Sequence, residues 1–170
     1  MAHITTSIKD SVINPFTLIG EDWMLITAGD IHSFNMMTAS WGGLGILWGK
    51  EVAFCFIRPT RYTYNFVNEN RFFTLSFFSE EYREALNICG SYSGRDVDKI
   101  KLTGLTPIED REHNTIFFDE AKLVLICKKI YYQDIESKNF LDENINSHYP
   151  LKDYHRMFIG EIVIALRKIQ

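Results

Sequence analysis

The sequence predicts a mainly β fold, in which the strands form a β-barrel and a few short helices lie outside it. Six short segments are apolar and rich in β-branched or aromatic residues, and that many strands need a closed or sandwiched sheet. Hydrophobic side chains make up 46% of the 170 residues, enough for a sizeable core. Because no repeat or linker-like stretch interrupts the chain, we expect residues 1–170 to form a single domain.

The expected strands share short apolar runs bounded by charged residues or by turn-forming residues. They cover residues 23–28, 34–40, 51–57, 72–78, 121–132 and 157–166. The first two are predicted to pair through a turn at residues 29–30. The last strand carries Gly160 in mid-run, where a β-bulge or a close backbone approach is the usual reason for a glycine.

Three short helices are expected between these strands, beginning near residues 60, 80 and 94. Ser79 is a suitable N-cap for the second helix. Ser93 and Asp96 form a capping-box-like pair that predicts the start of the third, and Gly104 predicts its end. We therefore expect the helices to lie on the outside of a β core.

Charge and composition exclude several classes of protein. The net charge of -4 and the isoelectric point near 5.7 give no positive field for a dedicated nucleic-acid binder. Residues 41–57, the most apolar stretch, are interrupted by Lys50 and Glu51, so we expect no membrane span. Three cysteines stand far apart without the spacing of a zinc site or redox pair, and the histidines are scattered, so we expect no metal and a reducing, cytoplasmic compartment.

The segment 35–45 combines a strand end with glycines, a pattern that can present backbone amides to a flat polar ring. Thr38, Ala39 and Ser40 would supply those amides, and Trp41 would supply an aromatic wall. The alternative interpretation is a glycine-rich connection with Trp41 in the core.

The segment 58–63 places two arginines and several hydroxyl groups at the start of a helix, which suits a phosphate. Arg58, Pro59, Tyr62 and Thr63 belong to it. The alternative is a solvated turn whose threonine caps the helix.

The segment 93–99 is a second phosphate candidate, with Ser93, Gly94, Arg95 and Lys99. Here the alternative is capping alone, because two aspartates in the segment oppose an anion. Both interpretations hold if the cations face one way and the carboxylates the other.

Two further side chains are weaker candidates. His155 could titrate near neutral pH and donate to a ligand, although a lone histidine beside a strand is usually structural. Cys127 precedes two lysines and could be a thiolate, although a buried strand cysteine is the simpler interpretation. The sequence contains no nucleophile elbow and no phosphate-binding P-loop, and Trp48 stands where a dinucleotide fingerprint needs glycine.

Five segments in this order resemble the flavin reductase-like FMN-binding split-barrel family, and most closely its flavoredoxin-like branch. They are residues 35–42, 56–63, 73–78, 89–99 and 155–163. The resemblance covers nearly the whole chain. It implies a six-stranded split barrel of Greek-key type, forming a homodimer with one FMN per subunit near the subunit interface.

The resemblance also implies which residues hold FMN. Those along the isoalloxazine ring and ribityl chain would be Thr38, Ala39, Ser40 and Trp41, with Arg58 and Pro59 flanking the flavin. Those around the phosphate would be Tyr62, Thr63, Ser93, Gly94, Arg95 and Lys99. No motif for a nicotinamide site is found, and no catalytic side chain is assigned.

The implied function is an oxidoreductase that passes reducing equivalents from NAD(P)H through bound FMN to flavin or another acceptor, which could be a redox protein. The alternative is a flavoredoxin-like electron carrier without NAD(P)H activity of its own. A third interpretation, a single-stranded nucleic-acid module with stacking aromatics, is opposed by the net charge of -4.

Overall fold

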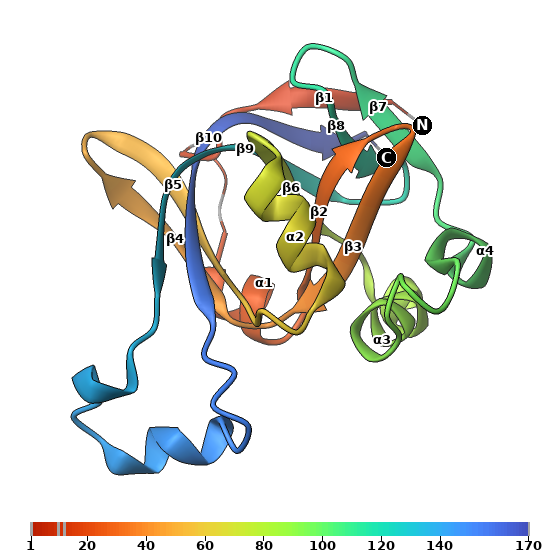
Figure 1. Ribbon diagram of the computed structural model, residues 1–170. Coiled ribbons are helices and arrows are strands. Elements are labelled where there is room, and N and C mark those ends of the chain that lie inside the picture. The colour runs from red at the N-terminus through yellow and green to blue at the C-terminus, as the bar shows by residue number, and fades with distance from the viewer. Residues whose placement is uncertain (1, 10, 12, 170) are drawn as a thin grey trace.

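One antiparallel sheet organises the molecule in the computed structural model, which describes residues 2–9, 11 and 13–169 (Figure 1). The sheet, as far as these residues show, contains β1 (His3–Thr6), β2 (Met24–Asp30), β3 (Ser33–Ala39), β4 (Gly42–Leu47), β5 (Lys50–Ile57), β6 (Phe72–Phe77), β9 (Leu123–Asp134) and β10 (Arg156–Lys168). The strand order is β3-β2-β6-β9-β10-β5-β4, and β1 pairs with the end of β10.

Smaller elements surround this sheet. A separate hairpin joins β7 (Pro107–Asp110) to β8 (Thr115–Phe118). The α-helices are α1 (Pro15–Gly20), α2 (Tyr62–Glu69), α3 (Arg83–Ser91) and α4 (Lys99–Thr103). The 3-10 turns are η1 (Glu80–Tyr82), η2 (Ser137–Asn139) and η3 (Glu143–His148). The mainly β architecture with outlying helices confirms the expected fold class.

The sheet closes on itself through a very short connection. Strands β3 and β4 lie at opposite ends of the strand order, yet only Ser40 and Trp41 separate them in the chain. Extended backbone between Ala39 and Gly42 spans at most about 11 Å, so the two ends of the sheet must meet. Because no ladder joins β3 to β4 among the described residues, the result is a split barrel with its seam at this connection.

The central strands are apolar on both faces because each face is covered. On β9, Leu123, Leu125 and Cys127 join a core cluster with residues from β2, β5, β6 and β10 inside the barrel. Val124 and Ile126 alternate with them and join a second cluster outside it, with α3 and β8. This burial on both sides explains the continuous apolar run that predicts the strand.

The irregularity expected at Gly160 is present. The pairing of β10 with β9 shifts register between Ile159 and Gly160. A Cβ atom on Gly160 would lie 2.6 Å from Cys127 Cβ and 2.7 Å from the ring of Phe73. Both expected reasons for the glycine, a bulge and a close approach, are therefore confirmed.

All six expected strands exist, and the sheet adds β1 and β4 to them. The third expected helix begins later than predicted. Ser93 Oγ accepts from the backbone N–H of Arg95 and closes a local turn, while Asp98 caps α4 by accepting from Lys101 N at 3.2 Å. Its end at Gly104, with φ of 69°, is confirmed.

The expected cap of the second helix is wrong. The Ser79 hydroxyl donates to the Glu81 carboxylate at 2.8 Å and makes no capping bond. The chain therefore first forms the 3-10 turn η1, and the regular α-helix α3 begins after it, at Arg83.

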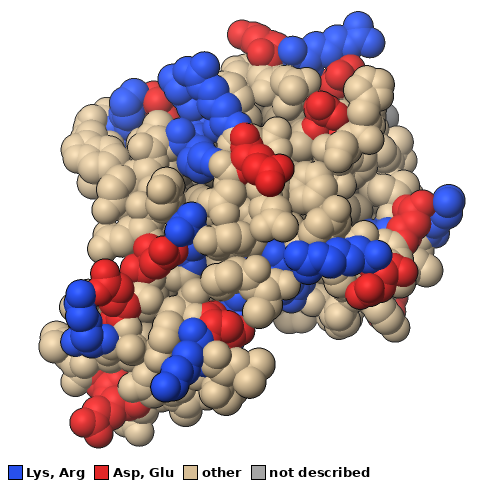
Figure 2. Space-filling model, viewed as in Figure 1, with Lys and Arg blue, Asp and Glu red and all other residues tan. Residues whose placement is uncertain are grey.

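Between β9 and β10, residues 135–155 extend away from the barrel and carry η2 and η3, at the lower left of Figure 1. We call this the projecting segment. On the face shown in Figure 2, basic side chains border acidic ones, on the projecting segment as on the barrel, so no continuous basic stripe crosses this face. Among the described residues, no helix combines the length and the apolar character needed to cross a membrane.

Candidate functional site

A first cavity of about 290 Å³ opens at the seam of the barrel. It is lined by Met37, Thr38, Ala39, Ser40, Trp41, Phe56, Arg58, Arg61 and His155. The end of β3, the connection to β4, the end of β5 and the entry to β10 thus contribute to one cavity. Five residues predicted to contact the flavin ring region lie together here: the run 38–41 and Arg58.

Trp41 forms an exposed wall of this cavity and does not belong to the core. Its side chain is 42% exposed, so the alternative interpretation of a buried Trp41 is wrong. Its ring centroid lies 5.0 Å from that of His155 and 5.6 Å from that of His148. These contacts hold a broad apolar face at the cavity mouth.

Arg58 links the first cavity to the projecting segment. Its guanidinium forms an ion pair with Asp153 at 2.7 Å and donates to the His148 carbonyl at 2.7 Å. It also lies 5.0 Å from the Tyr149 ring centroid. Since a carboxylate already compensates its charge, Arg58 mainly positions the segment that carries His155.

His155 is buried and remains neutral in the folded protein at neutral pH. Its Nδ1 lies 2.9 Å from the Tyr149 hydroxyl. Burial, with a smaller contribution from the positive charge of Arg58, lowers the pKa of His155 to about 4, and Asp153 partly opposes both. Of the two interpretations of His155, the structural one is therefore favoured over titration near neutral pH, and the burial that decides between them could not be predicted from the local sequence.

A second cavity of about 140 Å³ lies beside the first, with which it shares Arg61, and most of the residues that line it have polar side chains. It is lined by Asn35, Thr60, Arg61, Tyr62, Thr63, Ser91, Tyr92, Ser93, Gly94 and Lys99. Tyr62, Thr63, Ser93, Gly94 and Lys99 are five of the six residues predicted to surround the phosphate. The segments 58–63 and 93–99, distant in sequence, are thus brought together.

Arg61 lines both cavities and is the cation that they share. Its Nη2 donates to the Cys89 carbonyl over a long 3.4 Å, and no carboxylate pairs with it among the described residues. Burial lowers its pKa from the ordinary value, and it remains charged at neutral pH. A half-buried guanidinium without an anion is suited to an anionic ligand.

Gly94 and Asn35 pack directly against each other at the wall of the second cavity. Asn35 Nδ2 donates to Thr63 Oγ1 at 2.8 Å, which orients the amide. A Cβ atom on Gly94 would lie only 2.0 Å from Asn35 Oδ1. A glycine is therefore required here by close approach, and not by backbone conformation.

Lys99 is almost completely buried and ties two elements together. Its Nζ donates to the carbonyls of Met36, at 2.7 Å, and Cys89, at 3.0 Å. Burial lowers the pKa of Lys99 to about 8, with Arg61 acting in the same direction and Cys89 against it. The ammonium group joins β3 to α3 while it adds positive charge to the wall of the second cavity.

The remaining two predicted residues lie outside both cavity linings. Arg95 is exposed, its guanidinium stacks 4.6 Å from the Tyr62 ring centroid, and its Nη1 is 3.4 Å from the Thr60 carbonyl. It is therefore a neighbour of the second cavity. Pro59 is exposed and lines neither cavity.

The sequence did not assign several lining residues. Arg61 stood in the correct segment, and Asn35 was the first residue of another, so a pattern was available for both. Phe56 and Ser91 lie in segments that carry the family resemblance, but neither was assigned to the site, because nothing local distinguishes them from core or surface residues.

The cysteines give no reactive thiolate. Cys55, Cys89 and Cys127 are free and buried. Burial raises the pKa of Cys127 well above its ordinary value, which excludes the thiolate interpretation. Burial also raises the pKa of Cys89 to about 11, although Lys99 and Arg61 lower it. Among the described residues, no group of three or more His, Cys, Asp or Glu side chains is arranged to hold a metal ion.

Comparison with solved structures shows the same fold in flavoproteins of low sequence identity. Flavoredoxin of Desulfovibrio vulgaris (Miyazaki F) is 24% identical with a TM-score of 0.67, covering 97% of this chain and 77% of that chain. An FMN-binding domain of a flavin reductases-like enzyme from Shewanella baltica is 17% identical with a TM-score of 0.69, covering 98% and 77%.

A third structure is an NADH:FAD oxidoreductase from Streptomyces globisporus, in complex with NAD and FAD fragments. It is 15% identical with a TM-score of 0.66, covering 86% of this chain and 74% of that chain. No curated protein matches the chain. The model of the flavin reductase like domain matches residues 18–167, and the chain therefore belongs to the flavin reductase-like family.

Proposed function

We propose that this protein binds one FMN across the two cavities and transfers reducing equivalents from NAD(P)H to flavin or another acceptor. The observation that carries the proposal is the meeting of two cavities of different character at Arg61. One has an aromatic wall and a strand end, which suit a flat ring. The other is smaller and is lined by hydroxyl groups and two cations, which suits a phosphate.

The second cavity offers three kinds of phosphate ligand. Arg61 supplies an uncompensated guanidinium, and Ser93 and Thr63 supply hydroxyl groups. Helix α2 begins at Tyr62 with no side-chain cap, so the backbone N–H groups of Tyr62 and Thr63 remain available to an anion, whereas that of Tyr64 donates to the Arg61 carbonyl. This donor set fits a phosphate monoester dianion.

The first cavity would hold the ring. Trp41 would cover one side, while the strand end at residues 38–40 would supply backbone hydrogen bonds. FMN supplies reversible electron transfer when bound, and the chain's part is to hold and orient it. Neutral His155 adds a polar group to the wall without adding a charge.

We also propose that the protein is a cytoplasmic homodimer. Three buried, free cysteines suit a reducing compartment. Leu141 and Leu151 on the projecting segment are 102% and 81% exposed, and Trp41 at the cavity mouth is 42% exposed. Large exposed apolar side chains of this kind favour contact with a second copy. Light scattering that gives a monomer mass would refute the dimer.

The first test is retention and reduction of flavin. FMN is added to the purified protein, excess is removed by desalting, and absorption is recorded anaerobically before and after NADH or NADPH. Retained flavin that bleaches supports the oxidoreductase. Retained flavin that stays oxidised would instead support the electron carrier, and no retained flavin would contradict tight binding of FMN.

The second test locates the phosphate. Arg61→Ala is expected to weaken FMN by about 10- to 100-fold and riboflavin hardly at all, because a charge-assisted hydrogen bond is lost. Arg95→Ala should show the same selectivity with a smaller loss. Arg111→Ala is the control, since its side chain is 89% exposed and pairs with Glu109. Equal losses for FMN and riboflavin would place the phosphate elsewhere.

A further inference from the structure

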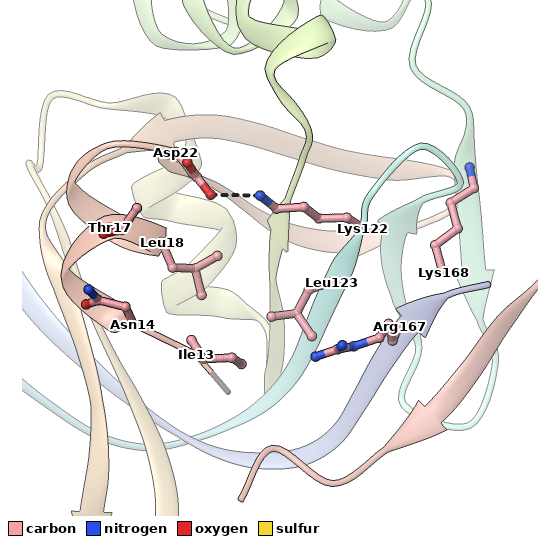
Figure 3. A pocket seen from close by; sticks show the side chains of 9 residues that line it. All are labelled: Ile13, Asn14, Thr17, Leu18, Asp22, Lys122, Leu123, Arg167 and Lys168. Carbon is pink, nitrogen blue, oxygen red and sulfur yellow. Dashed lines mark hydrogen bonds and ion pairs between the residues drawn. The ribbon is translucent and has the colours of Figure 1, made fainter. Parts of the chain in front are cut away.

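A third cavity, of about 720 Å³, shares no lining residue with the two cavities of the site (Figure 3). It lies between α1, the turn before β2, and the ends of β9 and β10. Its lining residues are Ile13, Asn14, Thr17, Leu18, Asp22, Lys122, Leu123, Arg167 and Lys168. Arg167 and Lys168 stand at the end of β10 farthest from His155, so this cavity belongs to a different part of the barrel.

The inner surface of this cavity is continuous with the barrel core. Leu18 and Leu123 are 8% and 5% exposed and belong to the interior cluster, and Ile13 packs against the same cluster. A volume of this size falls within the range of small-molecule sites. The cavity can therefore take an apolar body without moving the fold.

Arg167 brings a positive charge to the rim of this cavity, where its side chain is exposed. It pairs in register with Leu123, and Ala165, two positions earlier, is buried inside the barrel. Alternation along the strand puts the Arg167 side chain on the same face of β10 as Ala165, but it is exposed because it lies at the end of the strand. In Figure 3 its guanidinium points across the cavity toward Leu123 and Ile13.

The other two cations of this cavity are compensated, whereas Arg167 is not. Lys122 forms an ion pair with Asp22 at 2.7 Å, and Lys168 reaches the Asp119 carboxylate at 3.4 Å. The Arg167 side chain has no hydrogen bond or ion pair with any residue that the structure describes. An exposed arginine without an anion, at the rim of a cavity whose inner wall is apolar, can pair with the carboxylate of a ligand that enters the cavity.

We propose that this cavity binds a small carboxylic acid with an apolar body, of the size of a medium-chain fatty acid. The carboxylate pairs with the Arg167 guanidinium through two parallel hydrogen bonds. The alkyl chain lies against Leu18 and Leu123, where it displaces water from apolar surface. Because the cavity is separate from the proposed flavin site, this ligand binds whether or not FMN is present.

The test uses octanoate, 1-octanol and octylammonium as probes, with the full chain, with and without FMN. Binding is measured by calorimetry and located by amide and methyl NMR shifts. Octanoate is expected to bind and to shift signals of Leu18 and Leu123. Octanol should bind more weakly, and octylammonium should not bind, because only the carboxylate complements Arg167.

Variants then test the contribution of the Arg167 charge separately from that of the space in the cavity. Arg167→Ala should weaken octanoate at least 10-fold and leave octanol unchanged, whereas Arg111→Ala should change neither. Thr17→Trp, which fills the cavity, should abolish both while FMN binding is retained. Arg167→Gln serves if the alanine variant unfolds, with melting temperature as the check.

Several results would overturn the proposal. They are the absence of octanoate binding at millimolar concentration, equal affinity in Arg167→Ala and the unaltered protein, or competition between octanoate and FMN. Since each binding measurement is made without FMN as well, loss of the proposed flavin function would leave this result interpretable.

Discussion

Replacing Gly94 by alanine tests the packing that shapes the second cavity. The added Cβ would lie 2.0 Å from Asn35 Oδ1, 2.9 Å from its Cγ and 3.4 Å from its Nδ2. All three nearest atoms belong to one side chain, so the strain can be relieved only if Asn35 turns away or the backbone shifts. When Asn35 turns away, its 2.8 Å hydrogen bond to Thr63 Oγ1 is broken.

The expected cost follows from these contacts. Asn35 is 5% exposed, so the released amide loses its partner without gaining water, which costs about 1–3 kcal/mol. A displaced rotamer adds about 0.5–1.5 kcal/mol. Gly94→Ala restricts the unfolded chain and recovers about 0.4–1 kcal/mol. The free energy of unfolding should therefore fall by about 1–4 kcal/mol.

The assay is urea denaturation of four proteins: unaltered, Gly94→Ala, Asn35→Ala and the double variant. In the Asn35→Ala background the three clashing atoms are absent, and Gly94→Ala should change the free energy of unfolding by less than about 1 kcal/mol. Gly20→Ala is the control, because its Cβ would meet nothing within 4 Å. A cost of Gly94→Ala that is the same in both backgrounds would refute this account of the packing.

Three further predictions concern buried groups. Lys99→Met removes the lysine donor from the Met36 carbonyl and leaves the Cys89 carbonyl with only the long 3.4 Å bond from Arg61, so it should cost about 1–4 kcal/mol in chemical denaturation. Lys101→Met, with a side chain 85% exposed, should cost little. The pKa of His155 is about 4 in the folded protein, against an ordinary value of 6.5. When the pH is lowered, the unfolded chain therefore binds a proton at this residue before the folded protein does. The free energy of unfolding should then fall as pH drops from 6.5 towards 4, and His155→Gln should flatten this part of a pH series of melting temperatures. Gly160→Ala places a Cβ 2.6 Å from its nearest neighbour and should lower the melting temperature, while Gly43→Ala, at 3.5 Å, should not; equal shifts would contradict the close-approach argument.

The sequence predicted the strands well where both faces are buried, because such strands are unbroken runs of β-branched and aromatic residues. It missed β4, whose glycines resemble a connection. Gly42 is required by packing, since a Cβ there would lie 2.5 Å from the Phe54 carbonyl and 2.9 Å from Met24 Cε. A requirement set by distant residues leaves no local pattern.

Contacts between residues distant in sequence also explain which parts of the candidate site could not be predicted. The segments were found because hydroxyl, glycine and arginine residues cluster in sequence, and the structure brings them to adjoining cavities. Which arginine remains without an anion could not be predicted. Arg58 pairs with Asp153, far away in the chain, whereas Arg61 meets no carboxylate among the described residues. Whether an arginine is paired with a carboxylate is decided by tertiary contacts. As a result Arg61 is a better candidate ligand for an anion than Arg58, whereas the sequence analysis assigned Arg58 and not Arg61.

The position of β10 has a consequence for how the chain is made. This strand pairs with β9 along most of its length, with β5 on its first half and with β1 at its end. During synthesis β1, β5 and β9 all emerge before β10, so each has backbone groups without their final partners until then. Unpaired strand edges promote association between chains. The nascent protein therefore passes through an aggregation-prone stage just before β10 is complete, and the barrel closes only once β10 has been made.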